Sequence, residues 1–188
     1  MGQKGEETRG KLLDATQHLI EAGGYHHAGL NQVVAASGAP KGSLYFHFPG
    51  GKDQLVEEAV RRGGEEVSAL LAGLEHDSGA AGTAETLAAL LKVLGDRLEA
   101  SDWHKGCPVA TVALEMAAGN PALQRACSEV YGSWEATLTE RLAADGHASP
   151  ETAATAVLAL IEGALLLARA HRSRDPLERA ARALTLLT

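Results

Sequence analysis

Residues 37–48 read SGAPKGSLYFHF, and these twelve residues give the strongest indication of the fold. Gly38 can take the left-handed conformation that a sharp reversal of the chain needs. Pro40 suits the start of a helix, because its missing N–H would have no partner there. The stretch therefore predicts a tight turn that leads directly into a short helix from Pro40 or Lys41 to about His47.

A second helix is predicted just before this turn, from Leu30 to Ser37, with apolar side chains along one face. In the helix after the turn, Leu44 and Phe48 are four residues apart and so share a face. Helix, glycine-containing turn and helix form the outline of a helix-turn-helix, whose second helix enters the major groove of DNA.

The outward face of this second helix carries the candidate DNA contacts. Gly42 inside a helix costs about 1 kcal/mol relative to alanine, and close approach to a DNA backbone would explain it. The N–H groups at the helix start favour phosphate, and the Tyr45 and His47 side chains can donate to it. The predicted DNA-binding residues here are Pro40, Lys41, Gly42, Ser43, Tyr45 and His47, with Lys52 at the start of the following helix. The alternative is an ordinary amphipathic helix with a surface tyrosine and histidine.

The rest of the chain also has helical periodicity. Alanine, the best helix former, is abundant, and aromatic residues make up only 4%. We predict an all-α fold of about nine helices, in which Gly23-Gly24 ends the first helix and Ser149-Pro150 starts a late one. We expect a helix-turn-helix domain at 1–51 and a ligand-binding and dimerisation domain at 52–188. The further helices are expected at about 6–22, 52–74, from 83 past 98, 106–119, 120–144, 150–170 and 176–187.

Charge is unevenly distributed. The formal net charge is −7, but residues 1–55 contain five Lys or Arg and five Asp or Glu, so that segment is neutral and the remainder carries the full −7. If any part contacts phosphate, it is the first quarter, because acidity elsewhere repels DNA and helps to orient the molecule.

Several classes of protein are disfavoured. The first residues are polar and contain no apolar h-region, so we expect no signal peptide. Glu162 interrupts the most apolar stretch, so we also expect no membrane span and a cytoplasmic protein. Cys107 and Cys127 are too few for a disulfide framework, and together with His104 they match no zinc spacing. The sequence contains no nucleophile motif and no paired-carboxylate motif that would indicate an enzyme. We predict no metal, no cofactor and no catalysis.

Large, adaptable apolar side chains are candidates for a ligand pocket. They are Trp103, Met116, Tyr131 and Trp134. The last two helices carry more apolar residues than one amphipathic face needs, and a partner subunit would bury them. The predicted dimer-interface residues are Val157, Leu158, Ile161, Leu165 and Leu184. A plain core within one subunit is the alternative for both sets.

Residues 8–56, and above all SGAPKGSLYFHFPGGKDQLV, resemble the DNA-binding domain of the tetracycline-repressor (TetR) family. The sequence of this segment, together with Gly106-Cys107-Pro108-Val109, is similar to the sequences of the family branch that includes lincomycin-resistance and flavonoid-responsive repressors. The resemblance implies a homodimer that binds a palindromic double-stranded DNA operator and releases it when a small apolar or aromatic effector binds. The helix at 52–74 joins the DNA-binding and ligand-binding regions and would transmit the effect of the ligand from one to the other.

One departure from the family pattern concerns the start of the second helix, where a Thr or Ser usually caps the helix and contacts phosphate. This chain has Gly29-Leu30 there, so Asn31 or Gln32 is predicted to supply the polar contact. The competing function is a helical module that binds a small molecule or a protein but no DNA, and the neutral charge of residues 1–55 keeps this alternative open.

Overall fold

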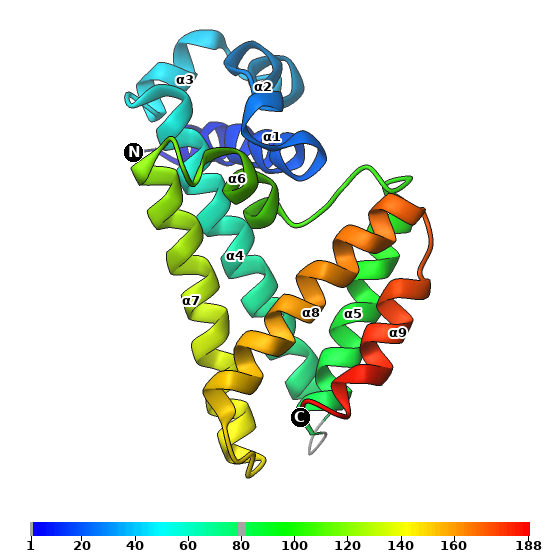
Figure 1. Cartoon of the computed structure of the whole chain (residues 1–188). Coiled ribbons are helices and arrows are strands. Elements are labelled where there is room, and N and C mark those ends of the chain that lie inside the picture. Colours follow the sequence, from blue (N-terminus) through cyan, green and yellow to red (C-terminus); the bar gives the residue numbers. More distant parts are fainter. Residues whose placement is uncertain (1, 79–81) are drawn as a thin grey trace. The chain divides into compact units, whose positions relative to one another are not determined.

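The computed structural model describes residues 2–78 and 82–188, and of 75–78 it describes the backbone only. All regular secondary structure in these described ranges is helical, which confirms the predicted all-α fold (Figure 1). The helices are α1 (Gln3–His27), α2 (Leu30–Ser37), α3 (Lys41–His47), α4 (Gly51–Ser78), α5 (Thr83–Ala100), α6 (Pro108–Met116), α7 (Pro121–Ala144), α8 (Pro150–His171) and α9 (Asp175–Leu184).

The first helix is interrupted where its two consecutive glycines lie. Gly23 and Gly24 have non-helical dihedral angles, and Gly24 has a φ of 71°, which glycine adopts at no steric cost. The helix resumes for a last turn that carries Tyr25. The glycines thus break the helix as predicted, but they redirect the chain and do not end α1.

The helices form two compact units. The first contains Met1–Gly64 and Cys107–Val130, and the second contains Glu65–Gly106 and Tyr131–Thr188. Both α4 and α7 therefore begin in unit 1 and continue into unit 2. The predicted domain boundary after residue 51 stays a prediction. It separates a DNA-binding from a ligand-binding function, whereas the two units are separated by how the chain packs.

Unit 1 is built around the packing of α1 against α2, α3 and α6. Fully buried aliphatic and aromatic side chains fill its core, and the Thr111 hydroxyl of α6 donates to the Ile20 carbonyl of α1 at 2.8 Å. Arg9 and Arg62 join α1 and α4 through ion pairs with Glu58 and Asp14. The core side chains are Leu12, Ile20, Val33, Leu44, Phe48, Leu55, Val56, Val112 and Leu123.

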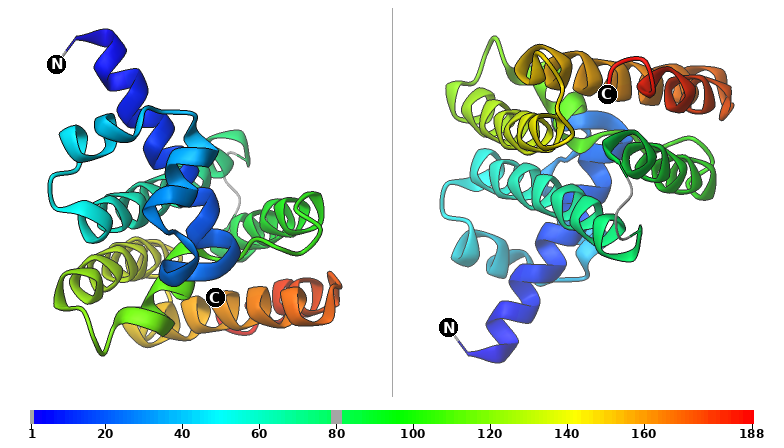
Figure 2. Two further views of the ribbon diagram at one scale, coloured as in Figure 1. Left: turned by 90° about the horizontal axis from the view of Figure 1, so that it is seen from above. Right: turned by 90° about the horizontal axis from the view of Figure 1, so that it is seen from below.

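Unit 2 is organised by α5, α8 and α9, each of which packs against the other two. In both views of Figure 2, α9 overlaps the later part of α8. Arg174, between α8 and α9, ties them to α5 by donating to Asp96 at 2.6 Å and to Glu99 at 2.9 Å. The Asp145 carboxylate accepts the Thr83 N–H at 2.9 Å, so the first turn of α5 is capped from the end of α7.

The start of α8 lies where the Ser149-Pro150 signal places it, although the Ser149 hydroxyl makes no capping hydrogen bond. One premise about this helix is wrong, namely that Glu162 leaves no run long and apolar enough to cross a bilayer. By length and composition Pro150–His171 is apolar enough to cross a membrane, despite Glu162. The core helix of a soluble protein meets the same criterion, and α8 contributes Ala154, Val157 and Ala168 to the core of unit 2.

Gly64 of α4 provides a direct test of the packing in unit 1. An added Cβ would lie 2.5 Å from Val130 Cγ1 of α7, whereas a Cβ at Gly132 in the same helix meets no heavy atom within 4 Å. We expect Gly64→Ala to lower the free energy of unfolding by about 1–3 kcal/mol through overpacking. Gly132→Ala should raise it by up to about 1 kcal/mol through helix propensity. Urea unfolding at fixed protein concentration measures both, and equal stability of the two variants would contradict this packing.

Candidate nucleic-acid interface

The turn between α2 and α3 has the conformation that its sequence predicts. Gly38 follows α2 in the left-handed region with a φ of 64°. The Ser37 hydroxyl accepts the Ala39 N–H at 3.2 Å, and the Pro40 carbonyl accepts the Ser43 N–H at 2.9 Å. Pro40 caps α3 and the helix begins at Lys41. The turn therefore sets the direction of α3 by local hydrogen bonds and one glycine.

Two buried side chains determine which face of α3 points outward. Leu44 is 1% exposed and Phe48 is fully buried. The Arg9 guanidinium of α1 lies over the Phe48 ring, 5.2 Å from its centroid, and also pairs with Glu58 of α4. Because Leu44 and Phe48 are four residues apart, their burial orients the whole short helix against α1.

The opposite face of α3 is open. Lys41, Gly42 and Tyr45 are exposed, and Tyr45 retains 53% of its accessible surface. A Cβ at Gly42 would meet no heavy atom within 4 Å. Intramolecular packing therefore does not explain this glycine, and the space above it is free for another molecule to approach the helix backbone.

His47 lies at the edge of this face and is half-buried. Its Nδ1 is buried and has no hydrogen-bond partner among the described residues. The imidazole stands edge-on to the rings of Phe46 and Phe48, at centroid distances of 5.0 and 6.4 Å. The ring nitrogen left to meet a partner is therefore Nε2, which as an N–H donates one hydrogen bond.

The remaining predicted contacts come from the starts of α2 and α4. Asn31 and Gln32 are exposed, and the N-cap of α2 is Gly29, which has no side-chain oxygen. Lys52 is half-buried, with Nζ 4.0 Å from the centroid of the Tyr25 ring, and burial lowers its pKa from the usual value. All nine predicted DNA contacts thus belong to unit 1 and none is buried, and their roles stay predictions.

Phe46 is a candidate that the sequence reasoning missed. Its side chain is 74% exposed on α3, more than that of Tyr45. A large exposed apolar side chain on a helix that enters the major groove can contact thymine methyl groups. Helical spacing could have predicted this exposure, because a helix that buries positions 44 and 48 directs position 46 away from the core.

The four predicted pocket residues are divided between the two units, and their role stays a prediction. Met116 ends α6 in unit 1, whereas the other three belong to unit 2. Tyr131 and Trp134 are edge-to-face neighbours on α7, with ring centroids 5.6 Å apart. Trp103 follows α5 with a φ of 63° and lines a separate hollow of about 440 Å³, together with Leu166 and side chains of the loop and the end of α8.

The predicted dimer-interface residues lie mostly inside the chain. Val157, Ile161, Leu165 and Leu184 are buried within unit 2, and Leu158 is half-buried. Side chains that already pack in their own subunit have little surface to offer a partner. The large apolar side chains that these helices expose are Leu166 and Leu167 of α8, which are therefore accessible to a partner.

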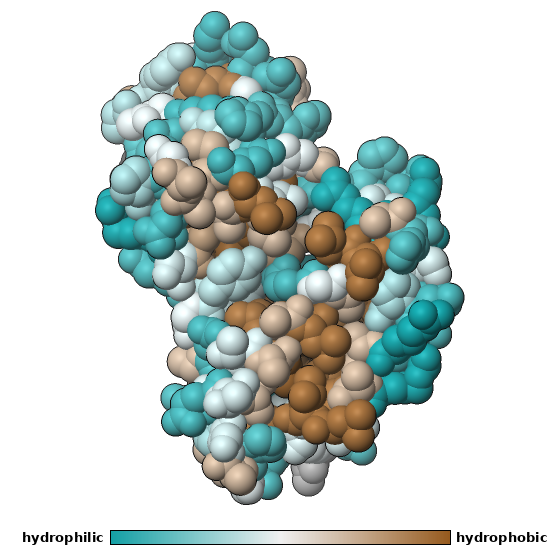
Figure 3. Space-filling model, viewed as in Figure 1, coloured by the Kyte–Doolittle hydropathy of each residue, from teal (hydrophilic) through white to brown (hydrophobic). Residues whose placement is uncertain are grey.

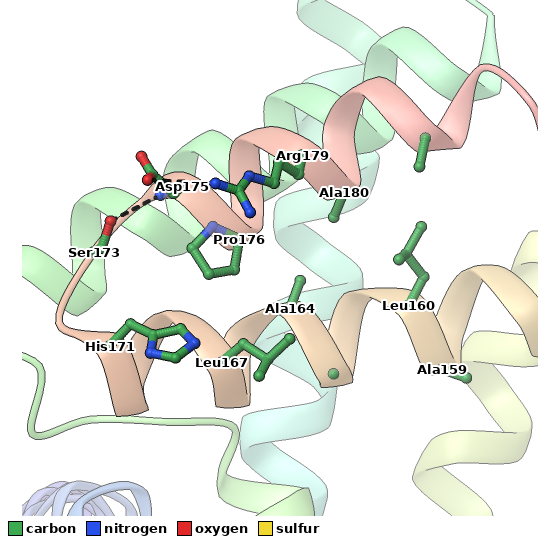
Figure 4. A pocket seen from close by; sticks show the side chains of 12 residues that line it. Ala159, Leu160, Ala164, Leu167, His171, Ser173, Asp175, Pro176, Arg179 and Ala180 are labelled. Atoms are coloured by element: carbon green, nitrogen blue, oxygen red, sulfur yellow. Dashed lines mark hydrogen bonds and ion pairs between the residues drawn. The ribbon is translucent and has the colours of Figure 1, made fainter.

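A groove of about 630 Å³ runs between α8 and α9. In Figure 4, Leu160, Ala164 and Leu167 of α8 face Pro176 and Ala180 of α9 across it. His171, Ser173, Asp175 and Arg179 form its polar end, where Ser173 accepts the Asp175 N–H at 3.2 Å. Apolar side chains gather over α8 on the face shown in Figure 3. The described residues contain no group of three or more potential metal ligands.

The comparisons with known proteins agree with this geometry. Residues 12–59 match the family model of bacterial regulatory proteins of the tetR family, and residues 83–183 match the C-terminal domain of LmrA/YxaF-like transcriptional regulators. The chain is 37% identical over 173 residues to the HTH-type transcriptional regulator LmrA of Bacillus subtilis, covering 91% of each chain. It is 35% identical over 173 residues to the uncharacterized HTH-type transcriptional regulator YxaF of the same organism, covering 91% of this chain and 90% of the other.

Among solved structures, a TetR transcriptional regulator from Chloroflexus aurantiacus superposes with a TM-score of 0.80 at 28% identity, covering 98% of this chain and 96% of the other. A regulatory protein TetR from Rhodobacter sphaeroides shares the fold, with a TM-score of 0.84 at 22% identity and coverage of 93% and 95%. The helix-turn-helix geometry, both family models and these relatives lead to one conclusion: the chain belongs to the TetR family of DNA-binding transcriptional regulators.

Proposed function

We propose that this regulator is a cytoplasmic repressor that binds a palindromic operator as a homodimer and leaves it when a small apolar or aromatic molecule binds. The observation that carries the proposal is the outward face of α3. Buried Leu44 and Phe48 present Tyr45 to solvent and leave the backbone at Gly42 open. A short helix of this kind, after a left-handed glycine turn, suits the major groove of DNA.

The regulatory step requires two conformations with different separations of the two α3 helices. In a dimer bound to its operator, the recognition helices lie about 34 Å apart, one turn of DNA. An effector that binds better to another separation shifts the population away from DNA. The helices α4 and α7 run from unit 1 into unit 2 and would carry this change. A coupling free energy of about 1–3 kcal/mol would change DNA affinity by roughly 5- to 150-fold.

The effector would bind in unit 2, the part of the chain that carries most of the LmrA/YxaF-like match. The Tyr131–Trp134 pair supports an aromatic or apolar ligand, because such rings line many small-molecule sites. Membership in a family of regulators supports a role without catalysis. A compound that raises the melting temperature of the protein and releases the operator over the same concentration range would identify the effector.

Substitution of Tyr45 tests the DNA-binding face. Tyr45→Ala should weaken operator binding about 30-fold, because each of two copies loses one hydrogen bond worth about 1 kcal/mol. Tyr45→Phe distinguishes the contribution of the hydroxyl to affinity from that of the ring. His104→Ala in unit 2 is the control for a substitution outside the interface. Fluorescence anisotropy with the promoter fragment of the protein's own gene measures all three. Unchanged affinity of Tyr45→Ala would show that the protein does not contact DNA through this face of α3. A parent protein that does not bind the fragment would favour the helical module that binds no DNA.

Substitution of Leu167 tests the proposed dimer. Leu167 is half-exposed on α8 beside the groove to α9. Leu167→Glu should shift the protein towards monomers in sedimentation experiments, because a charge buried at an apolar interface is strongly unfavourable. The control is Leu114→Glu on α6, where the replaced side chain is 81% exposed. A dimer that tolerates Leu167→Glu as well as Leu114→Glu would rule out this face.

A further inference from the structure

Three polar side chains from α1, α4 and the start of α7 form one hydrogen-bonded series in unit 1. The Tyr25 hydroxyl donates to Asp53 Oδ1 at 2.6 Å. The second oxygen of that carboxylate, Oδ2, accepts from Asn120 Nδ2 at 2.9 Å. The amide oxygen of the same side chain, Asn120 Oδ1, accepts hydrogen bonds from the N–H groups of Ala122 and Leu123 at 3.1 and 3.2 Å, and so caps α7. The aspartate and the asparagine are therefore each held on two sides.

The series ends at a lysine. Lys52, beside Asp53 at the start of α4, places Nζ 4.0 Å from the centroid of the Tyr25 ring, within the range of a cation–π interaction. The hydrogen bond to Asp53 holds the Tyr25 oxygen in place. Because a phenolic O–H lies in the plane of its ring, the direction of this bond also favours one orientation of the ring, and with it one position for the ammonium group. Burial together with the Asp53 hydrogen bond raises the pKa of Tyr25 to about 12, so this hydroxyl remains a donor at neutral pH.

The turn of α1 that carries Tyr25 is held independently. The Glu115 carboxylate of α6 accepts the backbone N–H of His26 at 2.9 Å. A Cβ at Gly24 would lie 2.5 Å from Glu115 Oε1, so the glycine makes room for this carboxylate. The Glu115 contacts thus hold the turn that carries Tyr25, beside Asp53 of α4, by a second set of interactions.

We propose that Tyr25, Asp53 and Asn120 are positioning residues that hold the Lys52 ammonium for contact with an operator phosphate. The series also keeps the Asp53 carboxylate directed at Tyr25 and Asn120, where its charge is shared by two donors. The inference rests on the proposed function, because it requires DNA to meet unit 1 at the start of α4. It assigns roles to a tyrosine, an aspartate and an asparagine that need not contact DNA themselves.

The salt dependence of operator binding separates this role from a merely structural one. Removing one ionic interaction with a phosphate should reduce the slope of log K against log salt by about 0.9, so Lys52→Ala should reduce it by about 1.8 for two copies. Asn120→Ser retains an oxygen that can cap α7 but loses the donor to Asp53. Tyr25→Phe keeps the ring and loses the hydroxyl.

In the full-length protein, Asn120→Ser and Tyr25→Phe should each lower operator affinity on the order of threefold to tenfold, typical of coupled neighbours. Both should move the salt slope towards that of Lys52→Ala, and neither should have a further effect in the Lys52→Ala background. Lys92→Ala in unit 2, which removes a lysine paired with Asp96, should leave the slope unchanged. Thermal unfolding identifies any variant whose loss of affinity comes from loss of folded protein.

The possible outcomes distinguish this inference from the proposed function. Two results would contradict the positioning role and leave the proposed repressor function unaffected. In the first, Lys52→Ala lowers the slope while Asn120→Ser and Tyr25→Phe do not. In the second, the effects of these two variants add to that of Lys52→Ala. If Lys52→Ala has no effect while Tyr45→Ala weakens binding, the inference again fails alone. If the parent protein does not bind the operator, both fail.

Discussion

The burial of Leu44 and Phe48 is the constraint on which the DNA-binding face depends. These two side chains leave a seven-residue helix only one orientation against α1, because rotating α3 would expose both of them to water. Burying a large apolar side chain is worth about 1.5–3 kcal/mol, whereas a short isolated helix has almost no stability of its own. The orientation of Tyr45, Phe46 and Gly42 is a consequence of what lies on the other side of the helix.

Unit 1 extends this constraint beyond the helix-turn-helix. It includes α6 and the first residues of α7, which join α1 through Thr111 and Glu115 and reach α4 through Asn120. The surface proposed to meet DNA is therefore built on two segments that lie far apart in the sequence. A conformational change in unit 2 can reach this surface through α4, through α7 and through the chain that enters α6. Regulation in this chain would involve all three connections.

The sequence predicted most of the fold because each helix has a local signal. Helical spacing, Gly38 and the Pro150 start signal place most helix boundaries within a few residues, although α1 continues past Gly23-Gly24 to His27. The side-chain partners could not be predicted, because residues far apart in the chain supply them. Nothing local indicates that Asn120 reaches Asp53, that Asp145 caps α5, or that Val157 and Leu184 pack within their own subunit. Met116 shows the same limit, since an apolar residue at a helix end gives no sign of which unit it joins.

Hydroxyl-radical footprinting of the protein, with and without operator DNA, tests whether the outward face of α3 contacts DNA. Tyr45 and Phe46 are 53% and 74% exposed, and Leu186 in unit 2 is 86% exposed, so all three should be oxidised in the free protein. Saturating operator DNA should protect Tyr45 and Phe46 and leave Leu186 unprotected. Operator binding with undiminished oxidation of both aromatic side chains would show that DNA meets another face of the protein.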